Sequence, residues 1–269
     1  MKAHAKVNLA LVVGPLRPDG KHEVLTVLQR LELHDVVELE PAQELVVEGF
    51  TSDTLVRAAL VALAGATGTA CAWRVRIDKR IPLAAGLGGG SADAAAALVL
   101  ANERLGRPLG PDELHRIAAA VGSDVSFFLG EGPQVGSGDG SELAPLQLPE
   151  DYVVLLALEQ GAAKASTADV YRSFDARRGA AGFGERRETL SLALARIETP
   201  RHLAELPRND LASSPLASEL ERLGAFRSDV TGAGPVVYAL FEDEDAAQRA
   251  ARELGGRART WITRPLART

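Results

Sequence analysis

The clearest chemical signal in the chain is a run of glycines, Gly86 and Gly88 to Gly90, between a predicted strand and an alanine-rich helix. Glycine lets the backbone turn tightly and point several N–H groups into one concavity. The start of the following helix, expected at about Ala92, adds a partial positive charge. These features predict an anion site, most naturally for the phosphates of a nucleotide such as ATP. The residues expected to form it are Pro82, Leu83, Ala84, Ala85, Gly86, Leu87, Gly88, Gly89, Gly90, Ser91 and Ala92.

Two familiar phosphate-binding loops do not fit this spacing. A P-loop needs a lysine and then serine or threonine after its last glycine, whereas Ser91 follows Gly90 directly. The dinucleotide-binding pattern needs a third glycine at position 91, and no early βαβ unit precedes it. A flexible linker is the structural alternative, but linkers do not normally join a patterned strand to a strong helix. The sequence therefore favours a third kind of phosphate loop.

A second candidate group lies on a predicted strand from Ala5 to Val13. Apolar residues alternate along it, and the period of two places Lys6 and Asn8 side by side on one face. A lysine on a strand is more often a solvated surface charge, so the pair alone does not indicate a functional site.

The remaining elements follow from hydrophobic periodicity and from turn residues. Ser52 or Asp53 is expected to cap a helix whose apolar stripe holds Val56, Leu60 and Leu63. Gly130 to Gly140 shows no helical or strand pattern. Further strands are expected at 24–33, 36–39, 73–77, 152–158, 227–231, 236–240 and 259–263, and further helices at 92–105, 111–121, 167–174, 188–197, 216–223 and 244–254.

This mixture without a regular βαβ repeat predicts an α+β fold. The 269 residues suggest two modest domains, with a boundary near residue 148 that separates 1–148 from 149–269.

Composition excludes several classes of protein. The net charge is −6 and no basic block interleaves with aromatic residues, which argues against nucleic-acid binding. Cys71 is the only cysteine, so no intrachain disulfide forms, and the five histidines show no metal-ligand spacing. The first residues do not read as a signal peptide, and no apolar window is long enough for a membrane span. We therefore expect a cytoplasmic protein with no membrane partner, either a monomer or a homodimer.

Eight further segments complete a pattern with the glycine loop. They are Ala5-Lys6-Val7-Asn8-Leu9, Pro18-Asp19-Gly20-Lys21-His22-Glu23-Val24, Leu25-Thr26-Val27-Leu28-Gln29, Leu33-His34-Asp35, Val121-Gly122-Ser123-Asp124-Val125-Ser126-Phe127-Phe128, Ser166-Thr167-Ala168-Asp169-Val170-Tyr171, Asn209-Asp210-Leu211 and Val230-Thr231-Gly232-Ala233-Gly234-Pro235. Together, and in this order, they resemble the GHMP kinase superfamily, and within it the 4-diphosphocytidyl-2-C-methyl-D-erythritol kinases of the non-mevalonate isoprenoid pathway. The resemblance implies a two-lobed α+β kinase, with an N-terminal ATP-binding lobe and a C-terminal substrate lobe, that uses ATP and Mg²⁺.

The resemblance also assigns roles to catalytic residues. Phosphoryl transfer is mainly a matter of neutralising charge and aligning atoms. Asp124 is the candidate acceptor of the substrate hydroxyl proton, and its alternative is a plain helix cap. Lys6 would stabilise that carboxylate and the developing negative charge. Asn8 would hydrogen-bond the substrate diol or hold Lys6 in place.

Other positions would bind the cytidine diphosphate part of the substrate. His22 would meet the edge of the cytosine and Tyr171 would stack on its face. The structural alternatives are a surface histidine in a turn and a tyrosine in a helix–sheet contact. Thr167 is either an N-cap or a donor to the diphosphate. Thr231 and Gly232 would buttress the phosphate loop, unless they form only a turn between strands.

This chain departs from the family pattern at two positions that bear on binding. Lys21 stands where the family usually has a tyrosine that is expected to stack on the cytosine. Ala92 replaces the second serine of the loop, which leaves Ser91 as the loop hydroxyl that could meet Mg²⁺.

Overall fold

The computed structural model describes residues 1–50, 53–162 and 166–266. Its strands are β1 (Lys2–Leu16), β2 (His22–Pro41), β3 (Val46–Glu48), β4 (Trp73–Asp78), β5 (Gln134–Ser137), β6 (Glu142–Pro145), β7 (Val153–Glu159), β8 (Arg227–Val230), β9 (Val237–Phe241) and β10 (Ala258–Thr263). Its α-helices are α1 (Leu55–Thr67), α2 (Gly89–Arg104), α3 (Pro111–Val121), α4 (Ser123–Phe127), α5 (Thr167–Ala176), α6 (Phe183–Leu194), α7 (Pro215–Arg222) and α8 (Glu244–Leu254). Two 3₁₀ helices, η1 (Pro200–Glu205) and η2 (Gly255–Arg257), complete the described part. The predicted α+β class is confirmed.

The chain forms two compact units that interleave along the sequence. Unit 1 holds residues 1–5, 33–83 and 88–131, and unit 2 holds 6–32, 84–87 and 132–269. Strands β1 and β2, which pair with each other, contribute residues to both units. The division into 1–148 and 149–269 stays a prediction.

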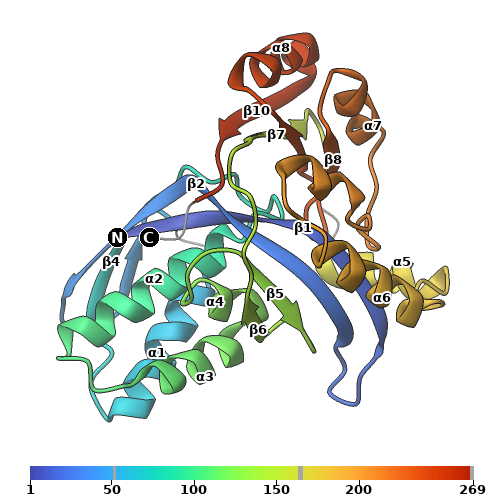
Figure 1. The fold of residues 1–269 in the computed structure, drawn as a ribbon. Coiled ribbons are helices and arrows are strands. Elements are labelled where there is room, and N and C mark those ends of the chain that lie inside the picture. Colours follow the sequence, from blue (N-terminus) through green and yellow to red (C-terminus); the bar gives the residue numbers. More distant parts are fainter. Residues whose placement is uncertain (51–52, 163–165, 267–269) are drawn as a thin grey trace. The chain divides into compact units, whose positions relative to one another are not determined.

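Unit 1 packs helices against a sheet. Its portion of β2 pairs with β4 in antiparallel register, from Val36 opposite Asp78 to Pro41 opposite Trp73, and β3 joins β4 in parallel. Alternate residues of β4 are buried, as the sequence predicts, and they pack with α1 and α2 in one core. Figure 1 shows α1, α2 and α3 as neighbouring helices. Because α2 carries a run of buried alanines, its backbone lies close to its neighbours.

Unit 2 contains a four-stranded antiparallel sheet in the order β10-β7-β9-β8. Helices α7 and α8 pack on this sheet around a core of apolar residues (Figure 1). In the same unit, the first part of β2 pairs with β5, and β5 pairs with β6. A smaller core joins β1 residues Leu11 and Val13 to Phe174 of α5.

Several sequence predictions of elements were wrong. Residues 24–39 form one strand without the expected break at His34-Asp35, because the Asp35 carboxylate is buried and bonded to Lys79 and to backbone N–H groups. The glycine-rich stretch 130–140 contains β5, which is stabilised by pairing with distant Thr26 to Leu28. Helix α6 begins five residues earlier than expected and ends three earlier. The short β3 and β6 were not predicted.

The predicted start of α1 is partly confirmed. Thr54 holds the N-cap position without a side-chain cap bond, and the Asp53 carboxylate accepts the N–H of Arg57 at 3.2 Å. Asp53 thus satisfies a donor of the first turn, although one residue before the N-cap position. The other candidate cap, Ser52, lies outside the described residues.

Candidate active site

The glycine loop leads directly into α2, which begins at Gly89, three residues earlier than predicted. Gly88 occupies the N-cap position in the left-handed conformation, with φ 70°, and has no side chain to cap the helix. The first helical bond runs from Ala92 N–H to the Gly88 carbonyl at 2.9 Å. The N–H groups of Gly89, Gly90 and Ser91 therefore precede the helical ladder, which is the arrangement that suits an anion.

Not all of the predicted loop residues can present side chains to a ligand. Ala85, Leu87 and Ala92 are almost completely buried, so they anchor the loop and can offer only backbone groups. Leu83 is exposed. Ala84 adopts a positive φ of 54°, a strained conformation for a residue with a side chain and a type of strain that concentrates at functional sites. Residues 84–87 belong to unit 2 and the rest of the loop to unit 1.

A buried ionic cluster, which the sequence did not single out, holds both ends of the unit 1 part of the loop. Lys79 Nζ bonds the carboxylates of Asp35 and Asp93, the latter at 2.7 Å. Asp35 also accepts the N–H groups of Arg80 and Ile81, which lead into the loop, while Asp93 lies one turn inside α2. The available signal was Asp93 itself, a carboxylate within a run of buried alanines.

Burial governs the charges in this cluster. Desolvation raises the pKa of Asp93 to about 7, although the Lys79 ammonium partly opposes the shift. Desolvation also works against the charge of Lys79, but the two carboxylates raise the pKa of its ammonium above the ordinary value. Asp93 Oδ1 is buried and accepts no hydrogen bond from any residue that the structure describes.

The predicted pairing of Lys6 with Asn8 is confirmed in unit 2. Both side chains are buried, and Lys6 Nζ donates to Asn8 Oδ1 at 2.6 Å. Thr26 fixes the orientation of this amide: its hydroxyl donates to the Ala10 carbonyl and accepts from Asn8 Nδ2, each at 2.8 Å. Because Nδ2 is committed to Thr26, Oδ1 must face the lysine. Thr26 was missed as a site residue, although it lies in a motif region of the sequence.

Thr231 and Gly232 join the same cluster. Thr231 Oγ1 accepts the N–H of Asn8 at 3.0 Å and lies 3.5 Å from the Gly86 carbonyl. A Cβ on Gly232 would lie 3.4 Å from Asn8 Oδ1 and 3.7 Å from Lys6 Nζ. A Cβ on Gly86, whose φ is 81°, would lie 2.5 Å from the Thr231 carbonyl oxygen, closer than atoms can approach. Within unit 2, the loop and the Thr231 turn therefore pack directly against each other.

Asp124 is the second residue of α4 in unit 1, and Gly122 occupies the N-cap position. The reading of Asp124 as the helix cap is therefore wrong. Its pairing with Lys6, a unit 2 residue, stays a prediction.

The two residues predicted to bind cytosine contact each other in unit 2. The rings of His22 and Tyr171 stack with centroids 4.9 Å apart. His22 Nε2 donates to Asp175 Oδ1 at 2.8 Å, and Asp175 lies one turn beyond Tyr171 on α5. When only Nε2 carries a proton, Nδ1 is the acceptor of the ring. Asp175 was missed, and its four-residue spacing from Tyr171 was the available signal.

The structure also shows an ion pair of Lys21 and the position of Thr167 at the start of α5. The Lys21 ammonium pairs with Asp139. Burial works against the charge of Asp139, but hydrogen bonds from Lys21 and Ser141 hold the pKa of its carboxyl below the ordinary value. The reading of Thr167 as an N-cap is wrong, because the Ser166 hydroxyl caps α5 by accepting the N–H of Asp169 at 3.1 Å.

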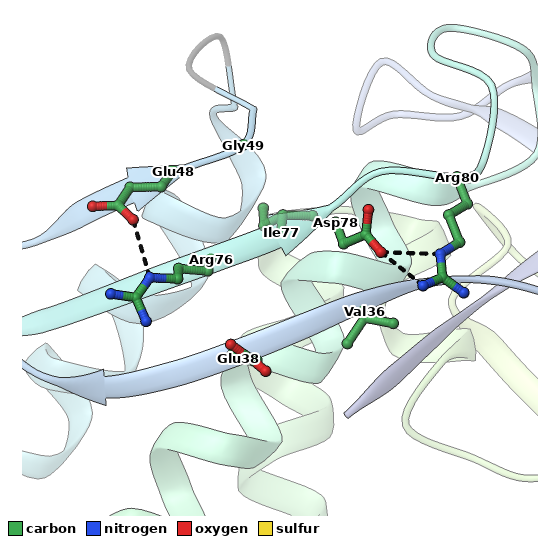
Figure 2. A pocket seen from close by; sticks show the side chains of 8 residues that line it. All are labelled: Val36, Glu38, Glu48, Gly49, Arg76, Ile77, Asp78 and Arg80. Carbon is green, nitrogen blue, oxygen red and sulfur yellow. Dashed lines mark hydrogen bonds and ion pairs between the residues drawn. The ribbon is translucent and has the colours of Figure 1, made fainter.

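A separate pocket opens on unit 1 with a volume of about 430 Å³ (Figure 2). Its charges pair mainly with each other, as Arg76 with Glu48 and Arg80 with Asp78. We assign it no ligand. Its lining residues are Val36, Glu38, Glu48, Gly49, Arg76, Ile77, Asp78 and Arg80.

The described residues contain no group of three His, Cys, Asp or Glu side chains that could hold a metal ion. In the same part of the chain, no helix is long and apolar enough to cross a membrane.

Comparison with known proteins identifies the family. Residues 54–132 match the GHMP kinases N terminal domain, and residues 193–259 match the GHMP kinases C terminal family. The chain is 41% identical to a 4-diphosphocytidyl-2-C-methyl-D-erythritol kinase of Nocardia farcinica, over 95% of this chain and 89% of that protein. A crystal structure of 4-(cytidine 5'-diphospho)-2C-methyl-D-erythritol kinase matches with a TM-score of 0.77 and 30% identity, covering 99% of each chain.

Mevalonate kinase of Methanococcus jannaschii shares the fold, with a TM-score of 0.77 at 14% identity over 99% of this chain and 98% of that one. The predicted kinase fold is thus confirmed. The chain belongs to the 4-diphosphocytidyl-2-C-methyl-D-erythritol kinase family of the GHMP kinase superfamily.

Proposed function

We propose that this chain transfers the γ-phosphoryl group of ATP to the 2-hydroxyl of 4-diphosphocytidyl-2-C-methyl-D-erythritol, by direct in-line transfer without a phosphoenzyme. The observation that carries the proposal is the buried Lys6–Asn8 pair, packed against Gly232 and sharing Thr231 with the Gly86 carbonyl. A buried ammonium is costly unless it has a task or a partner. Here its neighbours are the loop and the turn that the family uses for phosphate.

In this mechanism the N–H groups at the start of α2 and the glycine loop bind the ATP phosphates. Lys6 stabilises the charge that develops on the transferring group, and Asp124 accepts the proton of the attacking hydroxyl. Asn8 holds the lysine in place by accepting a hydrogen bond from Lys6 Nζ at 2.6 Å. Mg²⁺ would neutralise phosphate charge, and the Ser91 hydroxyl of the loop would be its ligand from the protein.

The cytidine diphosphate part would bind at His22 and Tyr171. A neutral His22 with its proton on Nε2 offers Nδ1 to the amino group of cytosine. The stack of His22 on Tyr171 supplies the flat aromatic surface on which a base can lie. Thr167, displaced from the cap position, stays a proposed donor to the diphosphate. We place the enzyme in the cytoplasm, where its nucleotide substrates occur.

The test is ADP release by the purified protein with MgATP, in the presence and absence of 4-diphosphocytidyl-2-C-methyl-D-erythritol. Homoserine, mevalonate and galactose run in parallel, since kinases of this fold act on such acceptors. We expect release to depend on the cytidyl substrate alone. Turnover of another acceptor would show that the cytidyl compound is not the substrate. Nucleotide binding without any turnover would indicate a non-catalytic regulator.

A further inference from the structure

One buried side chain of unit 2, Arg227 on β8, has no part in the chemistry described so far. Its exposed fraction is 1%, and it is the largest fully buried side chain among the described residues. A guanidinium has five N–H donors in a rigid fork and cannot be neutralised by losing a proton. Burial of such a charge is tolerated only when every donor finds an acceptor.

All five donors of Arg227 are occupied. Nε donates to the Tyr238 hydroxyl at 2.9 Å. Both Nη atoms donate to backbone carbonyls, and Asp229 lies 3.8 Å away as the nearest countercharge. The four carbonyls are those of Ala204 at 3.5 Å, Leu206 at 2.6 Å, Pro207 at 2.9 Å and Leu9 at 2.7 Å.

The Leu9 carbonyl is the significant partner, because it follows Asn8 on β1. This oxygen accepts twice, from Arg227 Nη2 and from the Tyr238 hydroxyl at 2.9 Å. The two donors occupy both lone pairs of the carbonyl. They fix the strand one residue beyond Asn8 and three beyond Lys6.

The same network reaches the other side of the Lys6–Asn8 pair. Asp229, the countercharge of Arg227, accepts the N–H of Asn209 at 2.8 Å. The side-chain Nδ2 of Asn209 in turn donates to the Gly232 carbonyl at 2.7 Å. One connected group of buried polar side chains therefore holds both the strand that carries Lys6 and the turn packed against it.

We propose that Arg227 and Tyr238 are positioning residues, which hold the Leu9 carbonyl and so fix Lys6 and Asn8 relative to Gly232. A buried ion could be replaced by apolar side chains without loss of stability, so its value here lies in geometry. The consequence for turnover rests on the proposed function, because it requires that Lys6 acts in the reaction.

The test compares Tyr238→Phe with Ser228→Ala. The first variant keeps the ring and removes the hydroxyl between Arg227 and Leu9. The second removes a buried hydrogen bond between β8 and β9, from Ser228 Oγ to the Tyr238 carbonyl at 2.8 Å, that does not involve β1. We measure kcat, the KM for ATP and the hydrogen–deuterium exchange of the β1 amides, well below the melting temperature of each variant.

For Tyr238→Phe we expect kcat to fall roughly 10- to 100-fold with the KM for ATP unchanged, as for a displaced catalytic group. Its β1 amides should exchange faster, while Ser228→Ala keeps wild-type kcat and exchange. A wild-type kcat in Tyr238→Phe, or an equal loss in Ser228→Ala, overturns the proposal.

Failure of the proposed function would look different. If the wild-type protein does not turn over the cytidyl substrate, the exchange measurement alone decides. Faster β1 exchange confined to Tyr238→Phe then supports the positioning role, and unchanged exchange overturns it. Arg227→Lys keeps the charge but not the fork, so it should match or exceed the effect of Tyr238→Phe; if it does not fold, the tyrosine variant still decides.

Discussion

At the scale of single residues, the proposed chemistry depends on which hydrogen bonds a few polar side chains make. Lys6 is oriented by Asn8, and Asn8 in turn by Thr26, whose single proton goes to the Ala10 carbonyl. Each step removes one alternative hydrogen-bonding arrangement. The lysine is therefore preorganised, which is where an enzyme gains most from a charged group.

Replacing this lysine should remove charge stabilisation while leaving the strand intact. For Lys6→Ala we expect kcat to fall by about 10²- to 10³-fold, the usual cost of deleting one stabilising donor. Lys2→Ala is the matched control, because Lys2 begins the same strand and is exposed. Steady-state assays of both variants decide, and near-normal turnover of Lys6→Ala would remove the lysine from the mechanism.

For Asp124→Asn we expect turnover to fall by about 10²- to 10⁴-fold, since the amide cannot accept the hydroxyl proton. Nucleotide binding should change little, because the phosphates are expected at α2. Asp112→Asn changes a carboxylate in the first turn of the neighbouring α3 and should remain active. Calorimetric titration with ATP beside the kinetic assay separates the two effects; an active Asp124→Asn enzyme would exclude it as the proton acceptor.

At the scale of elements, the glycine loop and the Thr231 turn pack so closely that no side chain fits at Gly86. Gly86→Ala should place a methyl group 2.5 Å from a carbonyl oxygen, at a φ that favours glycine. We expect a loss of about 1–3 kcal/mol of stability and a raised KM for ATP.

Gly65→Ala is the control, because this glycine lies within α1 with nothing near its missing Cβ. The control should gain about 0.5–1 kcal/mol. Urea denaturation of both proteins tests the contrast, and equal stabilities of the two variants would contradict the close packing at Gly86.

The Asp35–Lys79–Asp93 cluster predicts a pH dependence. The Asp93 carboxyl has a pKa of about 7 in the folded protein against 3.8 ordinarily. Between about pH 4 and pH 7 the folded state therefore holds a proton that the unfolded state has lost, so stability falls as pH rises through this window. In Asp93→Asn this contribution should vanish, giving a flatter curve of unfolding free energy against pH. An equally steep curve in the variant would assign the dependence to other groups.

The sequence predicted elements well where burial is periodic and poorly where distant partners decide. The alternation of β4 and the stripe of α3 are local properties, and both elements form as expected. Strand β5 forms because it pairs with residues Thr26 to Leu28 of β2. The local sequence of residues 134–137 does not reveal this pairing. In the site, period two sufficed to pair Lys6 with Asn8. Thr26, Asp93 and Asp175 instead contact residues far away in the sequence, and their local signals do not show which residues they meet.

At the scale of the whole molecule, the proposed activity predicts that nucleotide stabilises the fold. A ligand that binds only the native state at 100 times its Kd adds about 2.7 kcal/mol. We expect MgATP to raise the melting temperature of the wild-type protein and of Asp124→Asn alike. The rise should be smaller in Gly86→Ala, and scanning calorimetry with AMP as a control provides the measurement. A wild-type protein that MgATP does not stabilise would contradict nucleotide binding.

The interleaving of the two units has a consequence for how the chain is made. Residues 6–32 belong to unit 2, yet most of that unit is residues 132–269. While a ribosome is still synthesising the chain, the apolar stretch Leu9 to Val13 has emerged long before Arg227 and Tyr238, which bond the Leu9 carbonyl in the folded protein. An uncovered apolar strand invites pairing with other chains. The first strand of the protein therefore stays without part of its native contacts until nearly the whole chain has been made.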